Sequence, residues 1–293
     1  MIDPPLIVGS FLVAIVVGLT GMGGGALMTP MMMLFFNVPP LAAVSSDLVA
    51  SAVMKPVGSV VHLRRGTVDL RLVAWLCAGS VPAAFCGVFV ARAFAVGDGV
   101  KYALGVALLL AVAGLVAKTL IGGRAGTAEA ADVVVRPIPT LLVGTVGGLI
   151  VGVSSVGSGS LIIVALIALY PMLKANQLVG TDLVQAVPLV TSAALGHLLF
   201  GDFQLDLTLS LLLGAIPGVY LGARVSSRAP GGLIRAMLAI VLLASALKLL
   251  DVDNAVTLWI LLAAVAVAVA GWRRRVRAAA RRSSESADLA RAR

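Results

Sequence analysis

The 293-residue chain has little charge, since Asp, Glu, Lys and Arg make up only 12% of it, and it holds two histidines and two cysteines. Aromatic residues account for 5% and hydrophobic residues for 60%. A soluble domain of this composition would aggregate, whereas hydrophobic runs long enough to cross a hydrocarbon core of about 30 Å recur along the chain. The composition therefore predicts an all-α polytopic membrane protein, because a membrane barrel would show short alternating segments instead.

The sequence lacks the motifs of disulfide-bonded, metal-binding and catalytic proteins. Cys77 and Cys86 do not form a CxxC pair, so we interpret both as small core residues and expect neither a disulfide nor a metal site. The sequence contains no HExxH, GxSxG or Walker motif. These absences predict a protein that is not an enzyme and needs no cofactor. The N-terminal segment lacks a basic region, so no cleaved signal peptide is expected.

The chain contains an internal sequence repeat. The two histidines, His62 and His197, are 135 residues apart, and so are Asp47 and Asp182. The same offset relates a series of further residues: Leu48 to Leu183, Gly66 to Gly201, Gly79 to Gly214, Pro82 to Pro217 and Gly87 to Gly222. A twofold repeat in a very apolar chain is typical of membrane transporters built from two related halves.

We expect two repeats joined by a linker and followed by one extra helix. The first repeat covers residues 1–120 and contains the apolar segments 6–36, 41–63, 72–94 and 100–120. The linker covers 121–137, and the second repeat covers 138–250 with segments 138–170, 176–200, 205–226 and 232–250. A further transmembrane helix is expected at 254–272, followed by a basic cytoplasmic tail at 273–293.

Segments 6–36 and 138–170 are too long for one ordinary crossing, and glycines interrupt both. The interruptions read Gly18-Leu-Thr-Gly-Met-Gly-Gly-Gly25 and Gly152-Val-Ser-Ser-Val-Gly-Ser-Gly159. Each segment could cross once as a bent helix or turn back as a re-entrant hairpin. If both segments are hairpins, ten Lys and Arg residues outside the tail lie on the same side of the membrane as the tail, and three lie on the other side. If both segments cross once, the numbers are six and seven. The positive-inside rule therefore favours two hairpins.

Hairpins leave each repeat with three full crossings, so the second repeat must be inverted relative to the first. The acidic loop 201–206 then lies outside, and its basic counterpart 64–71 lies inside, as do the C-terminus and the tail. The N-terminus is expected outside. The tail carries eight arginines, which we interpret as contacts with anionic lipid headgroups and not with nucleic acid, because no aromatic residues are interleaved with them.

The glycine interruptions are the first candidate site. A broken helix leaves backbone groups unpaired, which is tolerated only inside protein or beside water. Half-helix N-termini carry partial positive charge and suit an anion; the alternative is that the glycines only permit close helix packing. We predict anion-binding groups at both interruptions: Thr20, Gly21, Gly23, Gly24, Gly25, Ser154, Ser155, Gly157, Ser158, Gly159 and Ser160.

Lys55 lies near the middle of segment 41–63, where a charge in hydrocarbon is expensive and by default functional. The equivalent residue of the second repeat is Val190, so the lysine has no counterpart. We interpret Lys55 as an anion-binding residue. The alternative is a structural ion pair with Asp47, and the two roles are compatible if substrate competes for the lysine.

The remaining polar residues suggest coupling or support of the hairpins. Asp47 and Asp182 either bond to the exposed backbone of an adjacent hairpin or carry protons, and Gln185 lies near Asp182. We interpret His62 and His197 as interfacial helix ends, with a proton-relay or gating role as the alternative. Coupling to protons or to sodium, and the oligomeric state, are left open by these patterns.

In these features the chain resembles the sulfite exporter TauE/SafE family of permeases. The resemblance rests on the glycines of 18–25, on Ser46-Asp-Leu48 followed by Lys55, and on the segment 62–69; the second half repeats them at 180–183 and 196–201. The pair Ser45-Ser46 departs from the Gly-Thr that is commoner in the family. The resemblance implies transport of small sulfur-containing anions, such as sulfite or sulfonates, across the inner membrane.

We therefore expect a secondary-active permease that binds a small oxyanion near the middle of the bilayer. Alternating access would rock one repeat against the other. A passive anion channel, or an accessory membrane subunit without a carrier cycle, is the alternative. The expected partners are the small anion and the lipid bilayer.

Overall fold

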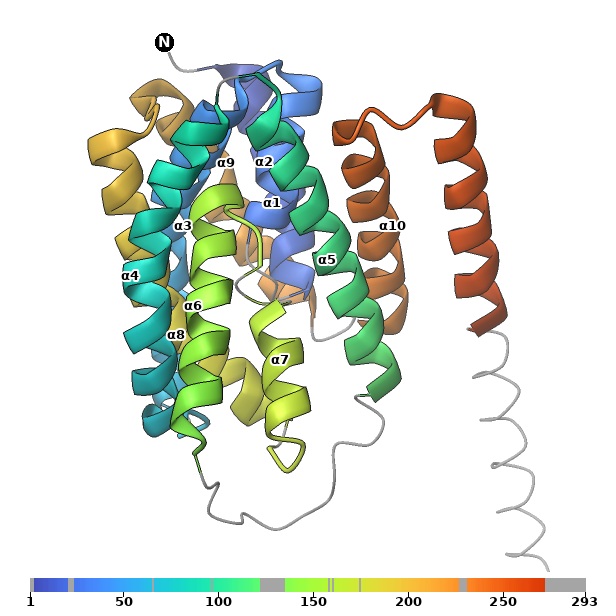
Figure 1. Cartoon of the computed structure of the whole chain (residues 1–293). Coiled ribbons are helices and arrows are strands. Elements are labelled where there is room, and N and C mark those ends of the chain that lie inside the picture. The colour runs from blue at the N-terminus through green and yellow to red at the C-terminus, as the bar shows by residue number, and fades with distance from the viewer. Residues whose placement is uncertain are drawn as a thin grey trace, which may run out of the picture.

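The computed structural model describes residues 3–20, 24–64, 66–95, 97–121, 135–157, 159, 161–173, 175–226 and 231–271 (Figure 1). The first half forms α1 (Pro4–Thr20), α2 (Gly25–Phe35), α3 (Pro40–Arg64), α4 (Leu70–Phe94) and α5 (Gly99–Ile121). The second half forms α6 (Pro137–Ser154), α7 (Leu161–Leu169), α8 (Ala175–Phe200), α9 (Leu205–Ser226) and α10 (Gly231–Leu249). A last helix spans Asn254–Gly271. The described part of the chain contains no strand, and the predicted all-α architecture is confirmed.

Six of the described helices are long and apolar enough to cross a membrane. They are Leu70–Phe94, Gly99–Ala117, Pro137–Ser154, Gln177–Phe200, Leu205–Gly222 and Asn254–Gly271. Three shorter apolar helices, Pro4–Leu19, Gly25–Phe35 and Ala236–Leu249, accompany them. The chain is therefore a multi-pass membrane protein, because so many apolar helices of spanning length are otherwise unsuited to water.

Two pairs of helices turn back inside the bundle. α1 and α2 are separated at the first glycine interruption, and their outer ends lie at the top of Figure 1. α6 and α7 are separated at the second, and their outer ends lie at the bottom. Gly157 and Gly159 have φ angles of 121° and 134°, so the turn between α6 and α7 uses conformations that only glycine adopts without strain. We call the two pairs the first hairpin and the second hairpin.

Each hairpin is packed by a helix from the other half. α4 packs along α6, and α1 packs along α9. A methyl group on Gly87 would lie 2.7 Å from Cα of Gly152, and one on Gly222 would lie 3.0 Å from Cα of Gly18. Gly87 and Gly222 are equivalent residues of the sequence repeat, and so are Gly18 and Gly152. The sequence repeat is thus accompanied by a repeat of contacts, with glycine allowing the helices to approach closely.

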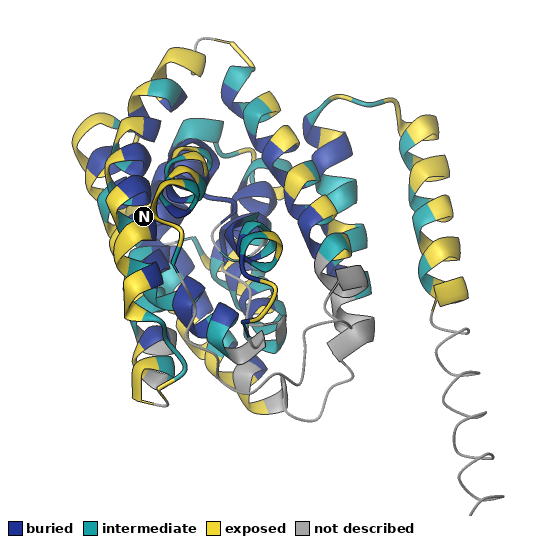
Figure 2. Cartoon of the chain, turned by 60° about the horizontal axis from the view of Figure 1, so that its bottom comes forward, coloured by how far each residue is buried: buried dark blue, intermediate teal, exposed yellow. Residues whose placement is uncertain are grey.

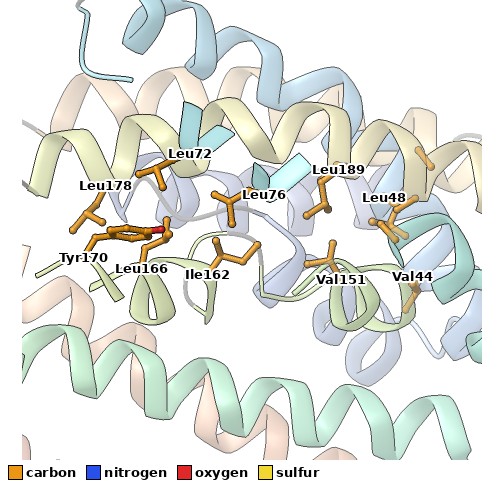
Figure 3. Close-up of a cluster of buried hydrophobic side chains, with 14 of the residues drawn as sticks. Val44, Leu48, Leu72, Leu76, Val151, Ile162, Leu166, Tyr170, Leu178 and Leu189 are labelled. Atoms are coloured by element: carbon orange, nitrogen blue, oxygen red, sulfur yellow. The ribbon is translucent and has the colours of Figure 1, made fainter. Parts of the chain in front are cut away.

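A buried apolar cluster fills the space between α3, α4, α6, α7 and α8 (Figure 3). Leu48, Leu76 and Leu189 are fully buried in it. Val190 belongs to the same cluster and is 0% exposed, whereas Lys55, its equivalent in the first half, is half-buried. The two halves therefore differ at this position in environment as well as in residue type.

The cysteines differ from the expectation for small core residues. Cys77 is half-buried, but Cys86 is exposed, so the interpretation of Cys86 as a core residue is wrong. The reason is its place on a part of the α4 surface that the described helices leave uncovered, where an apolar thiol side chain suits lipid equally well.

The last helix, Asn254–Gly271, stands apart from the bundle (Figures 1 and 2), and none of its residues is buried. Large apolar side chains such as Leu258 and Trp259 are exposed on it. The preceding turn is fixed by Asp251, whose carboxylate accepts hydrogen bonds from Lys101 Nζ at 2.7 Å and from Tyr102 Oη at 3.1 Å. The hydrogen bond from Lys101 is the main reason that the pKa of Asp251 lies below its ordinary value. The tail 273–293 lies outside the described residues.

Candidate functional site

Asp47 joins α3 to both hairpins. Its side chain is 1% exposed, and its Oδ2 accepts hydrogen bonds from Thr29 Oγ1 at 3.0 Å and from Ser155 Oγ at 2.6 Å. Thr29 belongs to α2 of the first hairpin, and Ser155 follows α6 in the second. The sequence suggested that Asp47 bonds to hairpin backbone, but these donors are side-chain hydroxyls that lie within reach of the carboxylate. The shorter distance is typical of a charge-assisted bond between a hydroxyl and a carboxylate.

The two hairpins touch each other beside this carboxylate. A methyl group on Gly25, the first residue of α2, would overlap the backbone carbonyl oxygen of Ser155 and would lie 2.7 Å from Ser155 Oγ. Ser155 caps α6 in a left-handed conformation, with φ of 58°. Glycine is therefore required at position 25 by the close approach of the second hairpin. The two interruptions that the sequence singles out meet in space.

Lys55 and Asp182 complete the charged part of the site. Lys55 lies on α3, after Asp47, and it is attracted electrostatically by Asp182 on α8 and, more weakly, by Asp47. Asp182 is 1% exposed, and its Oδ1 accepts a hydrogen bond from Gln185 Nε2 at 3.4 Å. Ser80 Oγ donates to Gln185 Oε1 at 3.4 Å. One cation and two buried carboxylates are thus assembled from α3 and α8, which pack against each other.

The histidines occupy equivalent places with different burial. His197 is 0% exposed; its Nε2 donates to the Gly152 carbonyl oxygen at 2.7 Å, and its Nδ1 shares a 2.8 Å hydrogen bond with Ser45 Oγ. His197 lies in the last turn of α8, as expected for a helix end, but α3 and α6 cover this end of the helix and bury the side chain. His62 is half-buried, and its Nδ1 shares a 3.0 Å hydrogen bond with Thr67 Oγ1.

Several predicted residues have other surroundings. Ser154 Oγ donates to the Ile150 carbonyl oxygen at 2.7 Å, within its own helix, and Gly24 is the N-cap of α2. The side chain of Thr20 and the residues Gly21, Gly23, Ser158 and Ser160 lie outside the described part of the structure, so their predicted roles stay predictions. Thr29, Ser45 and Ser80 were missed by the sequence reasoning. Their only signal is a hydroxyl in an apolar helix, which more often bonds to its own backbone.

Apolar helices of spanning length, two hairpins that meet inside the bundle, and a half-buried lysine that interacts with two buried carboxylates are typical of a polytopic membrane transporter. The chain belongs to the family described as Sulfite exporter TauE/SafE, which matches residues 6–249. That match begins in α1 and ends with α10. The last helix, Asn254–Gly271, lies beyond it.

Three relatives from Bacillus subtilis (strain 168) agree with this class. The chain is 36% identical to Probable membrane transporter protein YjnA over 252 residues, which cover 84% of this chain and 98% of the relative. It is 23% identical to Probable membrane transporter protein YdhB over 226 residues, covering 77% and 91%. It is 40% identical to Probable membrane transporter protein YunE over 79 residues, covering 27% of each. No solved structure matches the fold.

Proposed function

We propose that the protein is a secondary-active permease for a small sulfur-containing anion, such as sulfite or a sulfonate, and that it works by alternating access in the cell membrane. The observation that carries this proposal is Lys55, a half-buried cation on α3 that interacts electrostatically with Asp182 and with Asp47, the carboxylate that bonds to both hairpins. A charge inside the bilayer is costly unless it faces a partner or a transported ion. The family name supports a sulfur oxyanion as that ion.

The chemistry of the site suits a small oxyanion. A lysine ammonium is a compact charge with three hydrogen-bond donors, which matches an anion with three or four equivalent oxygens. α2 begins beside this site with Gly25, directly after the N-cap Gly24, so an anion can approach backbone N–H groups at the positive end of a helix. The carboxylates keep the lysine charged when the anion is absent.

The same packing suggests how the site opens to either side. We propose that the two halves are inverted repeats, because the hairpins enter the bundle from opposite ends and each is packed by a helix of the other half (Figure 1). A motion of one half would then open the site to one side while closing it to the other.

Cysteine labelling tests the inversion. Thr67 and Asp202 are equivalent residues of the repeat, in the loops before α4 and α9. In a background where Cys77 and Cys86 are serine, we expect a membrane-impermeant maleimide added to intact cells to label Asp202→Cys and not Thr67→Cys. Thr67→Cys should react only after the membrane is opened. Labelling of both cysteines from the same side would contradict the inverted arrangement.

Counterflow in proteoliposomes tests the carrier itself. Vesicles loaded with unlabelled sulfite, sulfate, thiosulfate or ethanesulfonate are diluted into the same labelled anion, and uptake is compared with that of unloaded vesicles. A carrier changes conformation faster with substrate bound than without, so unlabelled anion inside the vesicles should speed the uptake of labelled anion. At least one of the four anions should show this trans-stimulation. Equal uptake into loaded and unloaded vesicles would indicate a channel, and no uptake of any of the four would contradict the proposed substrate class.

A further inference from the structure

We infer that each anion crosses together with one proton, and that Asp47 carries this proton; the inference rests on the proposed function. Its starting point is the sum of charges at the site. With Asp47 and Asp182 ionised and Lys55 protonated, the three side chains carry a net charge of −1 before any anion arrives. An anion that binds Lys55 would bring this sum to −2 in surroundings where charges are poorly screened, which favours the uptake of a proton with the anion.

No neighbouring helix supplies the missing positive charge. α1, α2, α6 and α7, which form the two hairpins, contain no Asp, Glu, Lys, Arg or His. The other helices around the site carry their remaining charged residues at or near their ends: Arg64, Arg71, Arg92, Lys101, Lys118, Asp206, Arg224, Arg235 and Lys248. The further titratable side chains in the described interior are His197, whose two ring nitrogens are bonded to Gly152 and Ser45, the buried Tyr170, which bonds to Thr140, and the half-buried His62 and Cys77.

The hydrogen-bond partners distinguish the two carboxylates. Asp47 is bonded to the hydroxyls of Thr29 and Ser155. A hydroxyl donates to an ionised carboxylate and accepts from a protonated one, so this arrangement suits both states of Asp47. Asp182 is bonded to an amide NH₂ of Gln185, which only donates, and Ser80 holds the amide in that orientation. The described partners of Asp47 can therefore follow the uptake of a proton by reversing the direction of a hydrogen bond.

The same hydroxyls couple the protonation of Asp47 to the movement of the hairpins. Thr29 lies on the first hairpin and Ser155 on the second, so Asp47 holds both hairpins against α3. Protonation replaces the charge-assisted bonds with weaker neutral ones, and it reverses the direction of at least one of them. The contact between the hairpins is thereby loosened when a proton, and with it an anion, is bound. Proton and anion would then cross in the same conformational step.

Asp47 Oδ2 lies 2.6 Å from Ser155 Oγ and 3.0 Å from Thr29 Oγ1, which are direct hydrogen-bond distances. Both bonds can be kept when Asp47 takes up a proton, because a hydroxyl accepts as well as donates. Coupling to sodium is the competing outcome of the test.

The test uses the full-length protein in proteoliposomes and ethanesulfonate, a monoanion that takes up no proton at physiological pH. Valinomycin with equal potassium on both sides holds the membrane potential at zero, and the buffers contain no sodium. An outside pH two units below the inside pH should drive accumulation of up to about 100-fold at one proton per anion. A trapped pH dye should report acidification of the lumen when ethanesulfonate is added. Accumulation driven by a sodium gradient and not by the pH gradient would overturn the inference.

Variants assign the proton to its residue. Asp47→Asn should lose accumulation driven by the pH gradient, and its remaining ethanesulfonate exchange should be slower and independent of pH. The matched control Asp251→Asn removes a carboxylate from an exposed loop outside the site and should accumulate like the natural protein. His197→Gln should still accumulate ethanesulfonate when the pH gradient drives uptake. Retained accumulation in Asp47→Asn, or its loss in His197→Gln alone, would overturn the assignment.

The two hypotheses fail in different ways. If Asp47→Asn is inactive in every assay, lumen acidification by the natural protein still decides whether protons move with the anion. Ethanesulfonate counterflow without acidification would overturn the coupling and leave the proposed permease intact. An absence of counterflow for any sulfur oxyanion would contradict the proposed function, and with it the inference that rests on it.

Discussion

Lys55→Met should reduce anion counterflow by a factor of about 30 or more, because loss of one partner of a hydrogen-bonded charge pair costs about 2–5 kcal/mol of binding free energy. Methionine keeps the length and most of the volume of lysine, so packing against α8 changes little. The two carboxylates can take up protons when the ammonium is gone, which allows the variant to fold. The measurement is counterflow of the anion that gives the largest trans-stimulation in the natural protein.

Lys101→Met is the matched control for this variant. Lys101 begins α5 and forms an ion pair with Asp251 at 2.7 Å, and both side chains are partly exposed. An exposed ion pair contributes about 1 kcal/mol or less, so both transport and thermal unfolding in detergent should stay close to those of the natural protein. Size-exclusion chromatography of Lys55→Met should show a folded, monodisperse protein. Counterflow of Lys55→Met at the natural rate would rule out the proposed role of this lysine.

Gly25→Ala should abolish transport and lower stability, because its new methyl group would overlap the carbonyl oxygen of Ser155 where the hairpins touch. The neighbouring atom belongs to backbone and not to the end of a flexible side chain, so one hairpin must shift. Overpacking of this kind costs about 1–3 kcal/mol. The shift also disturbs the bond from Ser155 to Asp47, on which the geometry of the site depends.

Gly24→Ala provides the comparison one residue earlier. A methyl group there would meet only Met28 Cγ at 3.6 Å and Met54 Cε at 3.9 Å, which are ordinary contacts with flexible side chains. Its effect on thermal unfolding and on counterflow should be much smaller than that of Gly25→Ala. Equal behaviour of the two variants would mean that the close approach of Gly25 and Ser155 is not needed for transport.

Much of the architecture could be predicted from the sequence, because in a bilayer the length and apolarity of a segment decide its structure almost alone. The runs of apolar residues predict helices such as α4 and α9 at the places where they occur. The glycines of segments 6–36 and 138–170 predict the separation of α1 from α2 and of α6 from α7. The repeat also predicts that Lys55 and Val190 differ, and the structure adds that Val190 lies in the apolar core.

The partners that join the two halves of the chain could not be predicted, because they are more than 100 positions apart in the sequence. The bond from Ser155 to Asp47 and the bond between His197 and Ser45 join the two halves, with separations of 108 and 152 residues. Nothing local marks a serine as the partner of a distant carboxylate. His197 illustrates the same limit, since its burial depends on α3 and α6 lying across the end of α8.

The most direct test of the anion site is an anomalous scattering measurement on crystals of the protein soaked in 2-bromoethanesulfonate. The bromine marks one end of the anion, and its anomalous signal is independent of the phases of the protein. We expect a peak beside the Lys55 ammonium, at the place where Gly25 and Ser155 meet, and loss of this peak in crystals of Lys55→Met. A peak only at a surface cation such as Lys101, with the surroundings of Lys55 unchanged, would contradict the site.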